Sequence, residues 1–285
     1  MEDILEEREI SEAAIHAAFQ ELERVESLMS IYRPDSELSR LNRDGILRNP
    51  DPRLRKVLNF AKRLSAQTRG AFDVTVQPLW ELCQSAKRNE VPPSADEIAE
   101  ARSKVDWRQL EISKDAVCLH KKGASVTLNG IAQGYAADLA GTALARRGIT
   151  QALIDTGEFR SLGSNTNDKD WSVGIQHPRN VDALISIARL NGRCIATSGD
   201  YQTTFTDNFR RHHIFDPHTG TSPAELASVS VVAPEAMTAD ALSTAIFVLG
   251  PEKGARLARA HHGVEAFLVL KNGRTMATDG FPLKS

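Results

Sequence analysis

The stretch from Met237 to Gly250 contains the residues whose spacing most directly suggests chemistry. Its sequence, MTADALSTAIFVLG, predicts a helix that opens near Thr238, a residue type that favours the N-cap position. Asp240 and Thr244 are four residues apart, so both side-chain oxygens project from one face of the first two turns. This pair can ligate Mg²⁺, which takes oxygen ligands and usually only one or two protein carboxylates. The alternative is an acidic first turn that complements the helix dipole, with Thr244 packed in the core.

A second candidate is the turn NGIAQG at 129–134, between a strand predicted at 124–129 and a helix predicted over 133–147. Backbone N–H groups at the mouth of a helix face outward, so a glycine-containing turn there can hold a phosphate. The same glycines are also compatible with tight packing of the helix against the strand. The turn alone leaves both interpretations open.

Asp73 is a third candidate because it lies between Phe72 and Val74, in a segment expected to be buried. A buried carboxylate needs a partner. The partner can be a ligand, or it can be nearby backbone amides, which Asp side chains commonly bind in turns.

The histidines His212, His213 and His218 are candidates for metal binding or proton transfer. Adjacent histidines are not a zinc-ligand spacing. A histidine close to Asp216 can act as a general base oriented by that carboxylate. The competing interpretation is a turn rich in satisfied polar groups.

The composition restricts the class of protein. The chain has 285 residues, 41% of them hydrophobic and 25% charged, with a formal net charge of −2. This is enough material for a large core in one unit or two closely associated lobes. The near-zero net charge provides no basic footprint for nucleic acid, and no apolar run is long enough to span a bilayer.

The cysteines and the N-terminal sequence limit the function further. The three cysteines, Cys83, Cys118 and Cys194, are far apart and form no CxxC, which disfavours a disulfide framework or a zinc site. The N-terminal sequence MEDILEERE is acidic and lacks the features of a signal peptide. This is compatible with a cytoplasmic protein or with a trimmed form of an exported one.

The positions of apolar, capping and turn residues predict the elements that carry these candidates. Helices are expected over about 12–30, 51–67, 95–103, 133–147 and 252–261, with a helix opening at 238, a short helix capped by Ser36 and another starting at Pro78; strands are expected at 111–120, 124–129, 151–155, 171–176, 183–190 and 228–233, with a hairpin at 265–277.

Six segments, taken in chain order, resemble the ApbE-like family of bacterial FAD:protein FMN transferases. They are SxYxPxSExSxLN at 30–42, GAFDVTVQPLW at 70–80, LNGIAQGYAAD at 128–138, TGEFRSLG at 156–163, TSGDY with HIFDPHTG within 197–220, and MTADALSTAIFVLG at 237–250. Together they cover roughly residues 20–275, and their order makes the match specific although no single segment is decisive.

The resemblance implies a fold and an activity. The fold would be α+β, with a mixed, largely antiparallel sheet core and flanking helices, forming a single domain over residues 1–285 whose two closely associated lobes enclose the active cleft. The activity would be Mg²⁺-dependent: FAD is split, FMN is joined to a threonine or serine hydroxyl of a target protein through a phosphoester, and AMP is released. The acceptor would be a flavoprotein subunit of a redox membrane complex or a component of nitrous oxide reduction. Family members usually act on the periplasmic or outer side of the cytoplasmic membrane.

The resemblance also implies roles for individual residues. Asp240 and Thr244 would ligate Mg²⁺ together with the backbone carbonyl of Gly130, and His213 would take part in proton transfer with the acceptor hydroxyl; Asp240 and His213 are thus the expected catalytic pair. The positions expected to contact the flavin nucleotide are Met29, Tyr32, Ala71, Phe72, Asp73, Thr127, Gln133 and Phe215.

The chain departs from the family pattern at several positions. Thr127 stands where many relatives have Asp, Gln133 where they have Lys or Glu, and Ser243 where some carry another carboxylate. The usual double glycine corresponds to Gly157-Glu158 in this chain, a variant found in the NosX-like branch. These departures concern nucleotide affinity and the number of metal ligands.

Two other functions are compatible with the same residues. A hydrolase would split FAD into FMN and AMP with water as the acceptor, and would release AMP without any acceptor protein. A non-catalytic carrier would bind FAD and release no AMP, but storage needs neither the Asp240/Thr244 pair nor His213.

Overall fold

The computed structural model describes residues 2–165 and 167–284. The helices are α1 Glu2–Met29, α2 Glu37–Asp44, α3 Pro52–Gln67, α4 Gln77–Arg88, α5 Ala95–Ser103, α6 Ala132–Ala145 and α7 Ala236–Arg259, with 3-10 turns η1 Val74–Val76 and η2 Trp107–Gln109. The strands are β1 Ile46–Arg48, β2 Leu110–Ile112, β3 Ala116–Leu119, β4 Ala152–Asp155, β5 Phe159–Leu162, β6 Trp171–His177, β7 Asn180–Leu190, β8 Cys194–Gly199, β9 Leu226–Ala233, β10 Glu265–Leu270 and β11 Thr275–Ala277.

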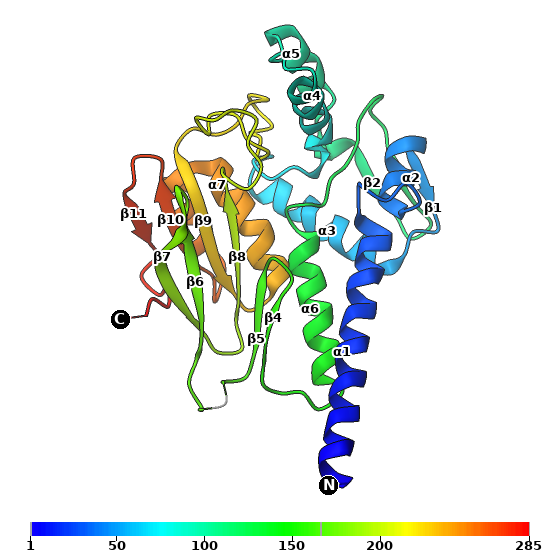
Figure 1. Cartoon of the computed structure of the whole chain (residues 1–285). Helices are drawn as coiled ribbons and strands as arrows, with labels where there is room; N and C mark the ends of the chain where they lie inside the picture. Colours follow the sequence, from blue (N-terminus) through cyan, green and yellow to red (C-terminus); the bar gives the residue numbers. More distant parts are fainter. Residues whose placement is uncertain (1, 166, 285) are drawn as a thin grey trace.

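Within the described ranges the strands form a six-stranded sheet in the order β11-β10-β9-β8-β5-β4, a three-stranded sheet β1-β3-β2 and the ribbon β6-β7. Every strand pairing in these sheets is antiparallel. Figure 1 shows α7 between the large sheet and the helices α3 and α6, while the ribbon β6-β7 lies on the other side of that sheet. The expected α+β class with largely antiparallel sheets is confirmed.

The large sheet is covered on both faces, as the burial of strand β9 shows. All eight of its residues are buried, and alternate side chains point to opposite faces of a strand. Val229 and Val231 belong to the main core with Leu242 and Phe247 of α7, whereas Val232 belongs to the core beneath the ribbon. The strand is therefore buried on both faces, including its two serines Ser228 and Ser230.

The α7 segment contains a break that matches the two helices expected from sequence. Gly250 has φ 78° and ψ 177°, values outside the helical region, and Pro251 follows it. Proline is well suited to the first position of a helix because its missing N–H is not needed there. The helix that opens near residue 236 and the helix predicted over 252–261 thus meet at a kink.

The predicted start of α7 was wrong. The helix begins at Ala236, and its N-cap residue Glu235 makes no side-chain capping bond. The cap comes instead from Asp138 on α6, whose two carboxylate oxygens accept the N–H groups of Ala236 and Met237, each at 2.9 Å. A carboxylate at this position also complements the helix dipole. A tertiary contact therefore replaces the local cap expected at Thr238.

The strand predicted at 124–129 was also wrong. The side chain of Asn42 donates to the carbonyl of Val126 at 2.8 Å and accepts its N–H at 2.7 Å. Thr127 donates its N–H to the carbonyl of Val74 at 2.8 Å. These partners leave no ladder for a neighbouring strand, although Val126 and Leu128 are buried as a strand would require. The preceding strand predicted at 111–120 divides into the β2-β3 hairpin.

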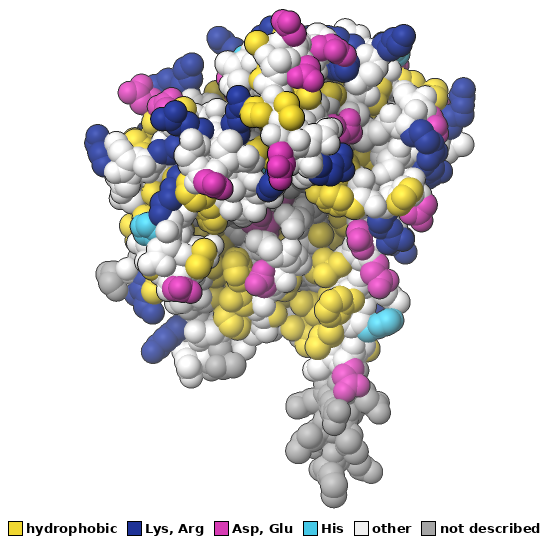
Figure 2. Space-filling model, turned by 45° about the horizontal axis from the view of Figure 1, so that its top comes forward, with side chains coloured by type: hydrophobic (Ala, Val, Ile, Leu, Met, Phe, Trp, Pro, Cys, Tyr) yellow, Lys and Arg dark blue, Asp and Glu magenta, His cyan; other side chains and the backbone are white. Residues whose placement is uncertain are grey.

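The surface shown in Figure 2 carries interspersed acidic and basic side chains, with hydrophobic side chains gathered over its lower half. Among the described residues, no helix is both long and apolar enough to cross a membrane.

Replacing the residue that caps α7 should destabilise the fold. In Asp138→Ala, two N–H groups of α7 and the Arg160 guanidinium, which pairs with Asp138, lose their partner. We expect the free energy of unfolding in urea to fall by about 2–4 kcal/mol. Asp96→Ala, an exposed carboxylate on α5, should change it by less than about 0.5 kcal/mol. A loss below about 1 kcal/mol for Asp138→Ala would contradict the capping role.

Candidate functional site

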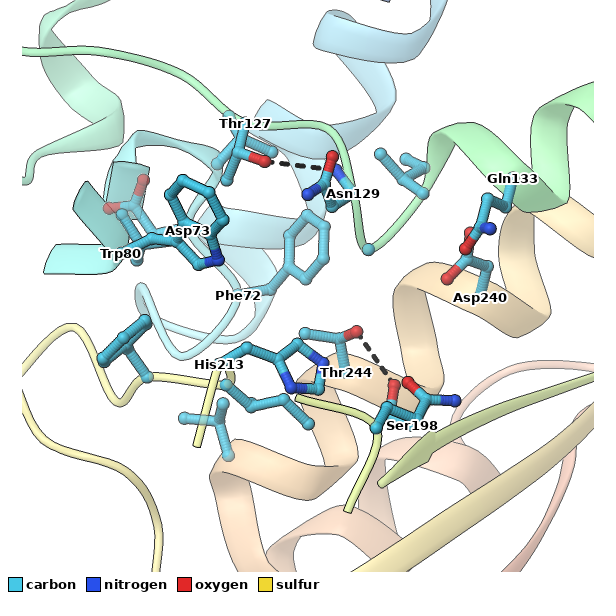
Figure 3. Close-up of a pocket in the computed structure, with 18 of the residues that line it drawn as sticks. Phe72, Asp73, Trp80, Thr127, Asn129, Gln133, Ser198, His213, Asp240 and Thr244 are labelled. Carbon is cyan, nitrogen blue, oxygen red and sulfur yellow. Dashed lines mark hydrogen bonds between the residues drawn. The ribbon is translucent and has the colours of Figure 1, made fainter. Parts of the chain in front are cut away.

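The central pocket lies where α6, α7 and β8 meet the segments before α4 and before β9. Figure 3 shows Asp240 and Gln133 toward the start of α6 and α7, and Trp80 on the opposite side. The residues that line the pocket are 71–74, 76, 80, 127, 129–131, 133, 158, 197, 198, 202, 213–215, 240, 244 and 248.

The structure brings most of the sequence-predicted site residues to this pocket. Those that line it are Ala71, Phe72, Asp73, Thr127, Gly130, Gln133, His213, Phe215, Asp240 and Thr244. Met29 is not among the lining residues and is 2% exposed in the main core. Tyr32 is 70% exposed, but its ring contacts that of Trp80 edge-on, with centroids 6.2 Å apart. It therefore lies outside the pocket beside one of its walls.

Asp240 and Thr244 face the same side of α7, as their spacing predicts, and both contact the turn at 129–134. Asp240 Oδ2 accepts the N–H of Gly134 at 2.9 Å. A Cβ on Gly130 would lie 2.9 Å from Thr244 Oγ1, so the backbone of this turn passes directly over the threonine. The three residues expected to ligate Mg²⁺ are thus neighbours in space.

The glycine at position 134 is required by packing. A Cβ there would lie only 2.2 Å from the carbonyl oxygen of Ala236, a distance that real Cβ atoms do not adopt. For this glycine, close packing is thus a sufficient explanation, although the helix packs against another helix rather than against a strand. Because α6 begins at Ala132, its first turn nevertheless opens toward the pocket.

Thr244 takes part in a chain of hydrogen-bonded hydroxyl groups. Ser198 Oγ lies 3.1 Å from Thr244 Oγ1 and 2.7 Å from Ser243 Oγ, and Ser243 Oγ donates to the carbonyl of Asp240 at 2.8 Å. The first of these bonds is drawn in Figure 3. Sequence reasoning assigned no role to Ser198, although it stands inside the TSGDY segment.

Two buried carboxylates line the pocket near α7. Asp240 is 3% exposed and Glu158 is 7% exposed. Burial raises the pKa of both carboxyls, and the neighbouring Asp240 raises the pKa of Glu158 further. None of the described residues that line the pocket is a lysine or an arginine. Sequence reasoning noted Glu158 only as a departure from the family pattern and did not expect it in the site.

These donors fit a hard divalent cation. A buried carboxylate without a positive partner is costly, and Mg²⁺ accepts carboxylate, hydroxyl and carbonyl oxygens together. Among the described residues there is no group of three or more His, Cys, Asp or Glu side chains placed to hold a metal ion, so any cation here would also need hydroxyl or backbone oxygens. The set of Asp240, Thr244 and the Gly130 backbone offers the kinds of oxygen that a hard divalent cation takes.

Asp73 uses its carboxylate to bind the chain itself. Oδ1 accepts the N–H and the hydroxyl of Thr75 at 2.8 and 2.7 Å, and Oδ2 accepts the N–H of Trp107 at 3.1 Å. Burial raises the pKa of Asp73, and these hydrogen bonds oppose that rise. Asp73 thus holds the 3-10 turn η1 against Trp107, which is the backbone-binding interpretation, while remaining at the pocket wall.

His213 lies in the pocket with one ring nitrogen engaged. Its Nδ1 is 3.2 Å from the carbonyl oxygen of Thr203, so this nitrogen carries the proton and Nε2 is left as an acceptor. Burial lowers the pKa of His213 below its usual value, which favours the neutral ring. The orienting group is this carbonyl rather than Asp216, whose carboxylate accepts the N–H of His218 at 2.9 Å.

His212 and His218 do not share the site. His212 is 0% exposed, packs edge-on against Phe247 with ring centroids 5.4 Å apart, and has a pKa that burial lowers to about 4. His218 is exposed in the turn held by Asp216. Only His213 of the three histidines has the position for proton transfer in the pocket.

Comparison with known proteins gives concordant results. The model of the ApbE family matches residues 3–268. A relative named FAD:protein FMN transferase in Haemophilus influenzae is 36% identical over 276 residues, which cover 90% of this chain and 78% of that protein. A relative of the same name in Escherichia coli K12 is 32% identical over 278 residues, or 90% of this chain and 77% of that protein.

Solved structures agree with this match. The ApbE protein of Thermotoga maritima superposes with a TM-score of 0.84 at 28% identity, covering 95% of this chain and 89% of that one. The flavinyl transferase ApbE of Pseudomonas stutzeri superposes with a TM-score of 0.81 at 33% identity, covering 94% and 87%. The sequence resemblance is therefore confirmed, and the chain belongs to the ApbE family.

Proposed function

We propose that this chain is an FAD:protein FMN transferase, which takes FMN from FAD and joins it to a hydroxyl of a target protein. The relatives that cover most of the chain bear this name. We further propose that the hydroxyl belongs to a threonine or serine, that AMP is released, and that the reaction depends on Mg²⁺. The acceptor, a flavoprotein subunit of a redox membrane complex or of nitrous oxide reduction, is supported by the sequence resemblance alone.

The observation that carries the proposal is that two buried carboxylates, Asp240 and Glu158, line the central pocket and no described lining residue is a lysine or arginine. The pyrophosphate of FAD is anionic, so it would be repelled by Asp240 and Glu158 in a pocket where no described lining residue is a lysine or arginine. In this proposal Asp240, Thr244 Oγ1 and the Gly130 carbonyl hold Mg²⁺. When bound, the cation supplies positive charge that neutralises the pyrophosphate and the leaving phosphate of AMP.

The proton is handled by His213. Its Nε2 is free to accept the proton of the acceptor hydroxyl, because Nδ1 donates to the Thr203 carbonyl. The hydroxyl oxygen forms a bond to the FMN phosphorus, the bond from that phosphorus to the bridging oxygen breaks, and AMP leaves with that oxygen. The attack needs a neutral histidine, which the burial of His213 favours.

The rest of the pocket suits the flat rings of a flavin nucleotide. Phe72 and Phe215 are almost fully buried, and Trp80 adds a third aromatic side chain to the lining. Aromatic walls bind ring systems through offset or edge-on contacts. These aromatic walls come from segments outside the large sheet, whereas Asp240 comes from α7, which packs against that sheet. We therefore propose that both lobes act as a single domain.

Removing the Asp240 charge tests the proposed function. With FAD, Mg²⁺ and an acceptor protein bearing a candidate threonine, wild type should add the mass of one FMN to the acceptor and release one AMP. In Asp240→Asn we expect both products to fall by at least about a hundredfold, because the proposed cation loses its carboxylate. Asp96→Asn, which removes an exposed charge on α5, should behave as wild type.

The products of wild type separate the rival functions. AMP release without a mass increase on any acceptor would support the hydrolase. Tightly bound FAD with neither product would support the carrier and contradict the transferase.

The pH dependence of the reaction tests His213. Protonation of Nε2 abolishes its ability to accept a proton, and burial places the pKa below the ordinary value of 6.5. At saturating Mg²⁺, kcat/KM should therefore hold at pH 6.5 and decline only at lower pH. In His213→Gln, kcat/KM should fall by about 10²–10⁴-fold, and the decline caused by protonation of His213 should disappear. In His218→Gln, both the value of kcat/KM and its decline at low pH should be those of wild type. An acid limb that persists unchanged in His213→Gln would exclude the proton-transfer role.

A further inference from the structure

Glu158 is a pocket carboxylate to which the proposed reaction assigns no task. It is 7% exposed and lines the central pocket together with Asp240 and Thr244. Its Oε2 accepts the N–H of Thr197 at 3.1 Å. Its Oε1 has no hydrogen-bond or ion-pair partner in the part of the chain that the structure describes. Because Glu158 lines the pocket, this oxygen is open to a ligand that enters from outside the chain.

The turn that carries Glu158 is held firmly. Residues 156–158 connect β4 to β5, whose last pair is Asp155 and Phe159. Gly157, at φ 95°, donates its N–H to Asp155 Oδ1 at 2.9 Å, and Thr156 donates its N–H to the Glu158 carbonyl at 3.1 Å. Glu158 is therefore fixed at the pocket by a closed turn rather than by a flexible loop.

The surroundings of Glu158 contain negative charge and no cation from the protein. Asp240 has one oxygen on the N–H of Gly134, and its Oδ1 has no partner among the described residues. Neither a lysine nor an arginine is found among the described residues that line the pocket. Two buried carboxylates in one pocket repel each other when both are ionised, and a positive ion between them removes that repulsion.

We propose that Glu158 is a second carboxylate ligand of the divalent cation held by Asp240 and Thr244. The inference rests on the cation site of the proposed function and adds a ligand to it. Two carboxylates balance the charge of a divalent ion, and the number of charged ligands is a main determinant of cation affinity in oxygen sites. The hydrogen bond from Thr197 would orient the glutamate, as the outer partners of ligating carboxylates do.

The test measures cation binding by flavin-free protein, using Mn²⁺ as the probe and electron paramagnetic resonance to count the free ion. Glu158→Gln should weaken Mn²⁺ binding by at least about tenfold, and Asp240→Asn should weaken it at least as much. Asp155→Asn is the matched control, because it removes an exposed carboxylate three residues away and keeps an oxygen for the N–H of Gly157. Its affinity should stay within about twofold of wild type.

Thermal unfolding separates a ligand from a structural residue. The amide oxygen in Glu158→Gln can still accept the N–H of Thr197. Without metal, its unfolding temperature should therefore equal or exceed that of wild type. Mn²⁺ should raise the unfolding temperature of wild type, and Glu158→Gln should lose most of this increase. Glu158→Asp keeps the charge and should bind Mn²⁺ more tightly than Glu158→Gln.

Each result is decisive for the inference. If Glu158→Gln binds Mn²⁺ as tightly as wild type while Asp240→Asn binds it more weakly, the role of Glu158 is overturned and the proposed cation site remains. Equal affinity in all variants would overturn both.

Discussion

The central pocket depends on the close approach of α6 and α7. The absent side chain at Gly134 lets the Ala236 carbonyl reach a distance that any Cβ would forbid, and the Gly134 N–H binds Asp240. One turn further along α6, Asp138 holds the first N–H groups of α7. These contacts fix both the rotation and the position of α7 against α6. Because helix side chains keep a constant angular spacing, they also fix where Asp240 and Thr244 point.

The pocket that results has two electrostatically different sides. Near α7, buried carboxylates without a protein cation favour a positive ion, and their low-dielectric surroundings strengthen that preference. At His213, burial and the Thr203 carbonyl favour a neutral imidazole with a free Nε2. A cation-dependent group transfer requires both conditions at once, since an anion must be held while a hydroxyl loses its proton.

A local prediction was confirmed where the partner lies in the next turn of the chain, and two local predictions failed where a residue remote in sequence supplies the partner. Ser36 caps α2 as predicted, because such a residue binds the next turn of its own chain. The expected cap at Thr238 failed because Asp138, 98 residues before Ala236, supplies the carboxylate. The expected strand at 124–129 failed because Asn42, 84 residues from Val126, takes its backbone groups. Periodicity carries no information about such partners.

The sequence by itself determined the family, the α+β class and the common face of Asp240 and Thr244, because ordered motifs and helical spacing are properties of the chain alone. Only the tertiary structure decided which polar groups face the pocket and which are already satisfied. It assigned both oxygens of Asp73 to Thr75 and Trp107, turned His212 into the core, and brought Glu158 to the same pocket as Asp240. The physical reason is that hydrogen bonding and burial of these groups depend on residues that are remote in sequence and adjacent only after folding.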